Sequence, residues 1–270
     1  MKKSTFEVAA RFDEMSADRI KEYPGCAGIP LEIKKYGTVE STNIVAKRLA
    51  EDGAPEWTIV TADSQTNGYG RLGRQYFSPG GSGIYISVIL RPDTVTEKLS
   101  DITTAAAVAV CEAIESVSDL KPSIKWVNDV YLDGKKVCGI LTETKFSGET
   151  AEYSVLGIGI NLYKPANGFD TSIRGKAGYL FEHAESERKI RIIAAVIASF
   201  YGYYTRLDST AHLDGYRKRM FLCGKTVGVT ANGETKQAEV LGLTDDFGLE
   251  VRYMNGKKDV LCVGEVSLTV

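Results

Sequence analysis

The chain has 270 residues, of which 43% are hydrophobic and 25% are charged. This is the composition of an ordinary globular protein with one large domain, or with a large domain and a small one. The 33 basic residues nearly balance the 35 acidic residues, and the formal net charge is -2. The overall charge therefore does not favour nucleic acid as a partner, although it leaves room for a local basic patch.

Neither a targeting segment nor a membrane span is evident. The N-terminal stretch MKKSTFEVAARFDEM lacks the apolar core of a signal peptide, and no run approaches the roughly 18 apolar residues of a membrane helix. The five cysteines are widely separated and include no CxxC pair, which argues against a disulfide framework or a zinc site; they are Cys26, Cys111, Cys138, Cys223 and Cys262. We therefore expect a cytoplasmic protein with reduced thiols and no membrane partner.

The first part of the chain, residues 1–30, is predicted to be a short extension. It contains at most one short helix opening at Ser4, followed by a linker over residues 16–25. Further on, helical spacing predicts a helix over 44–53, preceded by the capping residues of Ser-Thr-Asn at 41–43. Strands are expected over 57–63 and 84–90.

The middle of the chain continues this mixture of strands and helices. An alanine-rich helix capped by Ser100 is predicted over 99–117 and should pack closely on a sheet. Short turns separate the strands predicted at 123–129, 135–144 and 152–161, which favours antiparallel pairing. The longest helix is expected over 188–207, with the cations at 188–191 on its solvated face, and a shorter helix over 213–220.

The sequence pattern changes after residue 220, from mixed helices and strands to short strands alone. Four or five short strands follow, separated by Asn-Gly at 232–233, Asp-Phe-Gly at 246–248 and Asn-Gly at 255–256. Asn-Gly between alternating runs is a strong hairpin signal. Residues 221–270 are therefore predicted to form a small barrel-like β-domain.

Residues 66–83 form an unusually long glycine-rich connection between two predicted strands. It contains six glycines together with Arg71 and Arg74. A plain hairpin needs two to five residues, so this length indicates a loop that closes over a ligand. The motif is neither a Walker A sequence nor a dinucleotide fingerprint, and by itself a surface turn is an equally good interpretation.

Three further motifs could contribute to a pocket. Lys125, Asn128 and Asp129 in KWVND form either a plain turn or a site for a nucleotide and its metal. Glycines interrupt the apolar strands KKVCGIL and GIGIN at Gly139 and Gly159, which is typical of pocket walls where backbone touches a ligand.

His183 and His212 lie in unrelated contexts, so both are expected at the surface, with no metal cluster or catalytic triad.

Taken in order, STN (41–43), QTNGYGRLGR (65–74), SP (78–79), KWVND (125–129), KVCGIL (136–141) and GIGIN (157–161) resemble the motifs of biotin protein ligases. The resemblance runs from about residue 31 to residue 270, since the terminal β-domain is similar to that family's SH3-like domain. It implies an α+β (mixed α/β) fold. A catalytic domain over 31–220, with a mixed sheet flanked by helices, would precede the SH3-like domain over 221–270.

The resemblance also implies an activity. Biotin and MgATP would give biotinyl-5′-AMP and pyrophosphate, and a lysine of a biotin carboxyl carrier protein would then take up the biotin. The implied catalytic residues are Arg71, Lys136 and Asp129, with Asp129 holding Mg²⁺. Biotin would contact Ser41, Thr42, Asn43, Gln65, Gly68, Tyr69, Arg71, Lys136, Gly139 and Gly159. ATP would contact Arg71, Arg74, Tyr76, Lys125, Asn128 and Asn161.

The sequence departs from the family pattern at three positions. Tyr69 stands where arginine is usual, Val127 where proline is usual, and Tyr76 where a tryptophan is expected. A phenol ring at position 76 could still stack on adenine. The short segment before residue 31 cannot hold the winged helix-turn-helix found in some family members, so the expectation is a ligase without DNA binding.

Other functions fit the same residues. A lipoate protein ligase would use a similar fold and similar adenylate chemistry, and a non-catalytic biotin sensor would keep only the pocket. The pairing of KWVND with GRLGR favours biotin, and the retained Arg71, Lys136 and Asp129 favour catalysis. The sequence leaves open whether the protein is a monomer or a homodimer and which carrier protein it serves.

Overall fold

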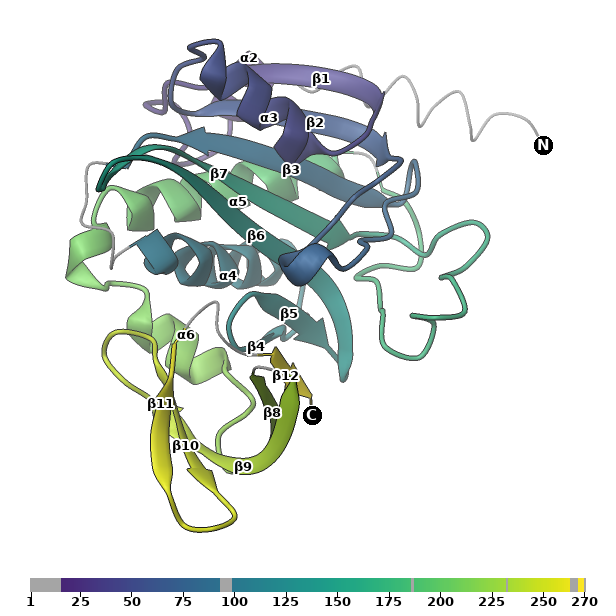
Figure 1. The fold of residues 1–270 in the computed structure, drawn as a ribbon. Helices are drawn as coiled ribbons and strands as arrows, with labels where there is room; N and C mark the ends of the chain where they lie inside the picture. The colour runs from purple at the N-terminus through teal and green to yellow at the C-terminus, as the bar shows by residue number, and fades with distance from the viewer. Residues whose placement is uncertain (1–15, 93–98, 186, 232, 263–266, 270) are drawn as a thin grey trace.

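The computed structural model describes residues 16–92, 99–185, 187–231, 233–262 and 267–269. It contains a seven-stranded sheet and a five-stranded sheet, which lie beside each other in Figure 1. No helix in the described part of the chain has the length and apolar character required to cross a membrane. All five cysteines are free, as predicted.

The large sheet is mixed, which confirms the predicted fold class. Its strand order is β1-β2-β3-β7-β6-β5-β4. Only β1 and β2 pair in parallel, and every other neighbouring pair is antiparallel. The strands are β1 (Glu32–Val39), β2 (Thr58–Gln65), β3 (Gly83–Leu90), β4 (Ser123–Lys125), β5 (Asp129–Leu132), β6 (Lys135–Ser147) and β7 (Thr150–Asn161).

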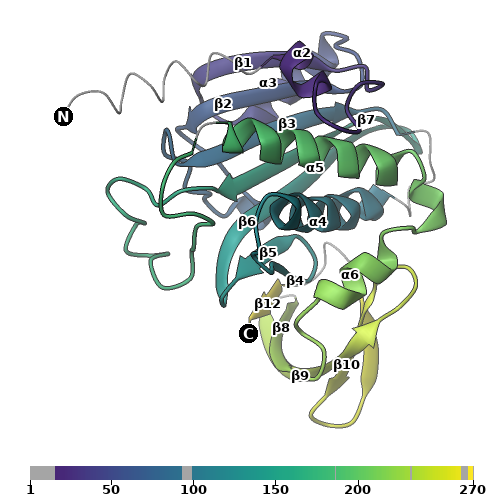
Figure 2. The same ribbon diagram turned by 180° about the vertical axis from the view of Figure 1, so that it is seen from behind.

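Helices cover both faces of this sheet. Helix α3 (Thr42–Glu51) packs on one face, and α4 (Leu99–Ser116) and α5 (Arg188–Tyr204) pack on the other, as the opposite views of Figures 1 and 2 show. The alternation along β2 explains the division, because Ile59 joins the main core and Val60 joins the smaller core beneath α3.

Helix α4 is the most deeply buried helix among the described residues. Fourteen of its 18 residues are buried between the sheet and α5, and its run of alanines allows this close packing. It is one residue longer than α5, so the prediction that α5 is the longest helix is wrong. Ser100 lies inside α4 rather than before it, and its hydroxyl donates to Asp101.

The segment predicted as a linker over 16–25 contains helix α2 (Ala17–Lys21). Ser16 caps it by accepting a hydrogen bond from the backbone N–H of Arg19 at 3.2 Å. Ile20 is fully buried, and the thiol of Cys26 donates to the carbonyl of Ala194 in α5. Apolar burial therefore overrides the helix-breaking composition of this segment. The helix predicted to open at Ser4 lies outside the described residues.

The strand predicted over 123–129 is in fact a tight hairpin. Strands β4 and β5 pair antiparallel, with Lys125 opposite Asp129, and Trp126, Val127 and Asn128 form the turn. The peptide bond between Trp126 and Val127 is cis. Lys125 and Asp129 are thereby brought side by side, instead of lying four residues apart along one strand.

The small sheet is antiparallel with the order β11-β10-β9-β8-β12, which confirms the predicted C-terminal β-structure. Its strands are β8 (Thr226–Ala231), β9 (Glu234–Leu243), β10 (Leu249–Tyr253), β11 (Lys258–Leu261) and β12 (Ser267–Thr269). Turns fall at the predicted Asp-Phe-Gly of 246–248 and Asn-Gly of 255–256, whereas residue 232 of the first predicted Asn-Gly lies outside the described residues. A 3-10 turn (Leu207–Ser209) and α6 (Leu213–Arg219) lead into this sheet from α5.

Phe247 joins the small sheet to the large domain. It lies between β9 and β10, its carbonyl accepts from the indole N–H of Trp126 at 2.9 Å, and its ring stacks on His212 at 4.5 Å. His212 is only 1% exposed, and its Nε2 lies 2.9 Å from the hydroxyl of Thr104, so the prediction of a surface histidine is wrong there. His183 is exposed as predicted.

The cations at 188–191 do not form one solvated face. Arg191 is exposed, but the guanidinium of Arg188 lies 4.1 Å from the ring centroid of Phe181. Burial lowers the pKa of Lys189 to about 8. The first turn of α5 is therefore partly packed against neighbouring segments.

Candidate ligand pocket

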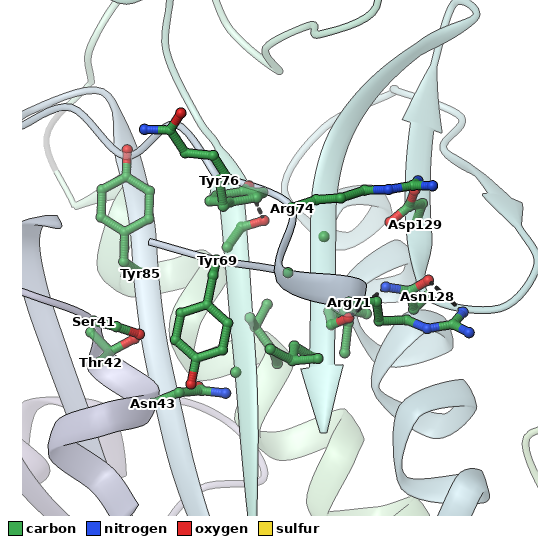
Figure 3. Close-up of a pocket in the computed structure, with 18 of the residues that line it drawn as sticks. Ser41, Thr42, Asn43, Tyr69, Arg71, Arg74, Tyr76, Tyr85, Asn128 and Asp129 are labelled. Carbon is green, nitrogen blue, oxygen red and sulfur yellow. Dashed lines mark hydrogen bonds between the residues drawn. The ribbon is translucent and has the colours of Figure 1, made fainter. Parts of the chain in front are cut away.

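One pocket gathers nearly all the residues singled out in the sequence. It is bounded by the start of α3, the segment 65–76, the β4–β5 turn and the middle of strands β6 and β7 (Figure 3). Of the predicted site residues, it is lined by Ser41, Thr42, Asn43, Gln65, Tyr69, Arg71, Arg74, Tyr76, Lys125, Asn128, Asp129, Lys136, Gly139 and Gly159. Gly68 and Asn161 lie outside the lining.

Several lining residues were not among the predicted site residues. They are Gly70, Leu72, Gln75, Tyr85, Ile86, Trp126, Ile140, Leu141, Gly157 and Ile158. Most are apolar or belong to the interior of strands, where sequence patterns indicate burial without distinguishing a pocket wall from the core. Gly157 belongs to the GIGIN motif and Trp126 to the KWVND motif, so other residues of these motifs indicated that both lie near the pocket.

The glycine-rich segment folds back on itself. We call residues 66–75 the binding loop. The N–H of Gly70 donates to the carbonyl of Arg74 at 2.8 Å, and Tyr69 forms a bridge with Gln75. Gly73 at the tip has a φ of 69°, which favours glycine, and Leu72 beside it is 70% exposed. The loop is thus a small closed hairpin across the pocket rather than an extended strand connection.

Gly68, in the same loop, packs closely against Tyr76 and Ser78. A Cβ atom at position 68 would lie 2.7 Å from the Ser78 hydroxyl and 2.8 Å from the carbonyl of Tyr76, closer than real contacts allow. Its carbonyl accepts from the N–H of Tyr76 at 2.8 Å. Glycine is therefore required at this position for chain packing, independently of any ligand.

The pocket has a polar end at the start of α3. Gln65 Oε1 accepts from both the backbone N–H of Thr42, at 2.8 Å, and its hydroxyl, at 3.1 Å. Gln65 Nε2 donates to the Ser78 hydroxyl at 2.8 Å. Ser41 begins the helix without a side-chain capping bond, contrary to the expected capping role, and is 3% exposed. This end offers fixed donors and acceptors to a neutral polar group.

The other end of the pocket is cationic. Lys136 Nζ lies 2.6 Å from Asp129 Oδ1, and Arg71 Nη1 donates to Asn128 Oδ1 at 3.5 Å. Burial is the main cause that lowers the pKa of Arg71 and of Lys125. With Arg74, four cations surround Asp129, which is the single acidic residue among the described lining residues. This surplus positive charge suits an anionic ligand.

Tyr76 lies between the two ends. Its hydroxyl donates to the carbonyl of Gly159 at 2.6 Å, and a Cβ atom at Gly159 would lie 2.5 Å from its ring. A Cβ at Gly139 would lie 3.1 Å from the same ring. The tyrosine that the resemblance associates with adenine therefore packs on the two glycines that it associates with biotin.

Asn161 holds the strand end behind this ring. Its Nδ2 donates to the carbonyl of Gly178 at 2.9 Å, and its Oδ1 lies 3.4 Å from the Tyr76 hydroxyl. The structure thus brings Asn161 to Tyr76 while leaving it outside the lining.

A Mg²⁺ ion bound here would find few protein ligands. The described residues contain no cluster of three or more metal-binding side chains, and Asp129 is already paired with Lys136. Mg²⁺ commonly uses one or two carboxylates together with substrate phosphates and water. The donor set therefore fits a metal that arrives with a phosphate ligand and contacts Asp129.

The mixed sheet, the glycine-rich loop and the paired polar and cationic ends form a pocket that suits a small molecule next to an anion. Residues 36–161 match the model of the Biotin/lipoate A/B protein ligase family. This match contains every predicted site residue.

Individual proteins extend the comparison. The chain is 40% identical over 149 residues to the bifunctional ligase/repressor BirA of Bacillus subtilis, covering 55% of this chain and 46% of that protein. It is 32% identical over 156 residues to the biotin--[acetyl-CoA-carboxylase] ligase of Paracoccus denitrificans, covering 54% and 64%. The matches thus span about half to two thirds of these relatives' length.

A solved structure is similar over a greater length. The biotin protein ligase of Aquifex aeolicus in complex with biotin and ATP has a TM-score of 0.71 and 25% sequence identity. The similarity covers 89% of this chain and 99% of that chain. This similarity therefore extends well beyond residues 36–161, which make up less than half of the chain.

Proposed function

We propose that this protein is a biotin protein ligase. It activates biotin with MgATP to biotinyl-5′-AMP and transfers the biotinyl group to a lysine of a biotin carboxyl carrier protein. The observation that carries the proposal is the single pocket in which the polar end at Thr42 and Gln65 adjoins the cationic end at Arg71 and Lys136. The similarity to a ligase described with biotin and ATP supports it.

The polar end would receive the ureido group of biotin. A ureido group presents one carbonyl acceptor and two N–H donors, so it needs partners of both kinds. Thr42, Asn43 and Gln65 supply them. The bond between Thr42 and Gln65 and the bond from Ser87 to Asn43 already fix their orientation. The apolar part of biotin would then lie along Gly139, Gly159 and the Tyr76 ring.

The cationic end would promote adenylate formation. An oxygen of the biotin carboxylate attacks the α-phosphorus of ATP, and the bond to the departing pyrophosphate breaks. Two anions must approach to bonding distance, so Arg71 and Lys136 stabilise the charge that concentrates between them. The ion pair with Asp129 holds Lys136 Nζ in position.

The remaining predicted residues would serve ATP. Lys125, Asn128 and Arg74 lie around Asp129 and suit the phosphates and ribose side of a nucleotide. Mg²⁺, when bound, neutralises phosphate charge, and Asp129 is the carboxylate that would hold it. In the second reaction the neutral ε-amine of the acceptor lysine attacks the anhydride carbonyl, and AMP leaves, so no protein nucleophile is required.

We also propose the division of the chain into an extension over 1–30, a catalytic domain over 31–220 and a small β-domain over 221–270. The proposal is supported by the separate hydrogen-bonding of the two sheets. All the lining residues of the pocket belong to the middle segment.

The test is to combine the protein with biotin, MgATP and a carrier domain and to examine the carrier by mass spectrometry. One added biotinyl group is expected, and none without ATP. Supplying lipoic acid in place of biotin is the matched control, since the matched family includes lipoate ligases. A lipoyl product without a biotinyl product would contradict the proposal. So would the absence of biotin-dependent pyrophosphate exchange, which would indicate a non-catalytic sensor.

A further inference from the structure

A half-buried polar cluster adjoins the polar end of the pocket, and two of its members, Glu143 and Lys47, have no role in the chemistry proposed above. The carboxylate of Glu143 in β6 accepts three hydrogen bonds from two other segments. The donors are Asn43 Nδ2 at 2.8 Å, Lys47 Nζ at 2.5 Å and the hydroxyl of Tyr69 at 2.9 Å. Helix α3 and the binding loop are thereby tied to one side chain of the sheet.

This cluster continues into the polar end of the pocket. The Ser87 hydroxyl lies 2.6 Å from Asn43 Oδ1 and 2.8 Å from the Thr42 hydroxyl. Thr42 in turn donates to Gln65, which reaches Ser78 just beyond the binding loop. The loop is therefore tied to the same chain of hydrogen bonds at both ends, through Tyr69 on one side and Ser78 on the other.

The geometry of Tyr69 shows what the cluster does. Figure 3 shows its ring extending from the binding loop toward Asn43, across the pocket. Its hydroxyl has a charged acceptor in Glu143, and Lys47 balances that charge. Hydrogen bonds to charged partners are stronger than neutral ones, so this contact is a strong link between the loop and the sheet.

We propose that Glu143 and Tyr69 are positioning residues that hold the binding loop closed over the polar end of the pocket before any ligand binds. They slow the escape of bound acyl adenylate without touching its reacting atoms. This role for the adenylate rests on the proposed function, whereas the closed loop is a property of the ligand-free protein. The tyrosine at position 69 therefore contributes through its side chain, whose hydroxyl donates to Glu143.

The test uses two conservative variants and one matched control. Tyr69→Phe removes only the hydroxyl, and Glu143→Gln removes the charge while keeping the shape. The control is Glu51→Gln, because Glu51 at the far end of α3 lies 3.4 Å from Lys145 Nζ and 3.2 Å from the Tyr153 hydroxyl. It presents the same three residue types, and none of the three lines the pocket.

The first measurement needs no ligand. Arg71 is half-buried in the pocket and must leave it before trypsin can cut after it, so the rate of cleavage at Arg71, followed by mass spectrometry, reports loop opening. Both variants should be cut about tenfold faster than the unmodified protein, the factor that corresponds to roughly 1.4 kcal/mol. Glu51→Gln should be cut at the unmodified rate. Unchanged cleavage in both pocket variants would overturn the proposal, and their thermal unfolding shows whether the overall fold is kept.

The second measurement follows the release of preformed biotinyl-5′-AMP. Both variants should release it about tenfold faster, and the double variant should release it no faster than Glu143→Gln alone, because Tyr69→Phe removes only a bond that Glu143→Gln already weakens. If the unmodified protein forms no adenylate, the proposed function fails, and the cleavage rates still decide whether the loop is held closed. If adenylate forms and both variants release it at the unmodified rate, the positioning role is wrong.

Discussion

The two ends of the pocket are built in opposite ways. At the polar end, Thr42, Asn43 and Gln65 are joined by hydrogen bonds of 2.6 to 3.1 Å with Ser87, Ser78 and one another. At the cationic end, Arg71 makes a 3.5 Å bond to Asn128, and four cations share one carboxylate. The side chains of the polar end satisfy one another, whereas the cationic end carries a surplus of positive charge that suits an anion. Specificity and charge stabilisation are thereby assigned to separate parts of one cavity.

The sharpest way to break this contrast is to remove a cation from the reacting centre. Lys136→Ala should lower the rate of adenylate formation by about a hundredfold or more, because a preorganised charge is lost where the transition state needs it. Biotin binding at the polar end should change much less. Pyrophosphate exchange and biotin titration measure the two effects. Lys135→Ala, at the exposed neighbouring position, is the control and should behave like the unmodified protein.

Arg71 connects the binding loop to the cationic end, so its loss should affect retention. Arg71→Gly should release the adenylate about tenfold faster or more and allow it to label lysines of bystander proteins, which a streptavidin blot detects. Arg71→Lys keeps the charge without the planar fork and should fall between the two. Unmodified labelling in both variants would contradict this assignment of Arg71.

The packing of Tyr76 on Gly159, between the two ends of the pocket, can be tested by adding one methyl group at position 159. Gly159→Ala would place a Cβ atom 2.5 Å from the Tyr76 ring, so the ring must move and the KM for biotin should rise about tenfold. Gly37→Ala is the matched control, because Gly37 also lies in a strand and has no atom within 4 Å of the added position. Equal KM values in the two variants would show that Tyr76 moves freely.

The smallest expected effect concerns pH. Burial raises the pKa of Glu143, but the hydrogen bonds from Lys47, Asn43 and Tyr69 together lower it by more. The net effect is a lowered pKa. A carboxyl with a lowered pKa in the folded state contributes stability above its unfolded pKa and loses it as pH falls through the folded value. Urea unfolding should therefore show Glu143→Gln less stable by about 1 kcal/mol at pH 7, with the difference shrinking below about pH 4. A constant difference across this range would contradict the shift.

Much of the large sheet could be predicted because its signals are local. Short turns indicated the antiparallel pairing of β6 with β7, and glycines marked the pocket walls at Gly139 and Gly159. The hairpin within residues 123–129 was missed, because Trp126 and Val127 are typical strand residues and only tertiary packing makes them a turn. Local composition also missed α2, whose stability comes from burial of Ile20.

Long-range contacts limited the prediction of the site. Glu143 occupies an ordinary position within a strand, and its importance depends on Asn43, one hundred residues away. His212 is buried because Phe247 stacks on it from the other sheet. Neither contact leaves a periodic trace in the sequence, so pattern analysis placed the motifs in one pocket without revealing what holds them there.

The bond between Trp126 and Phe247 bears on how this molecule can be divided. Trp126 lines the pocket, yet its indole N–H finds its acceptor in the small sheet. A fragment ending near residue 220 would retain every lining residue and still lose that acceptor, together with the ring that covers His212 and Tyr216. Shortened versions made for expression or crystallisation would therefore carry the full set of pocket side chains on a loosened wall.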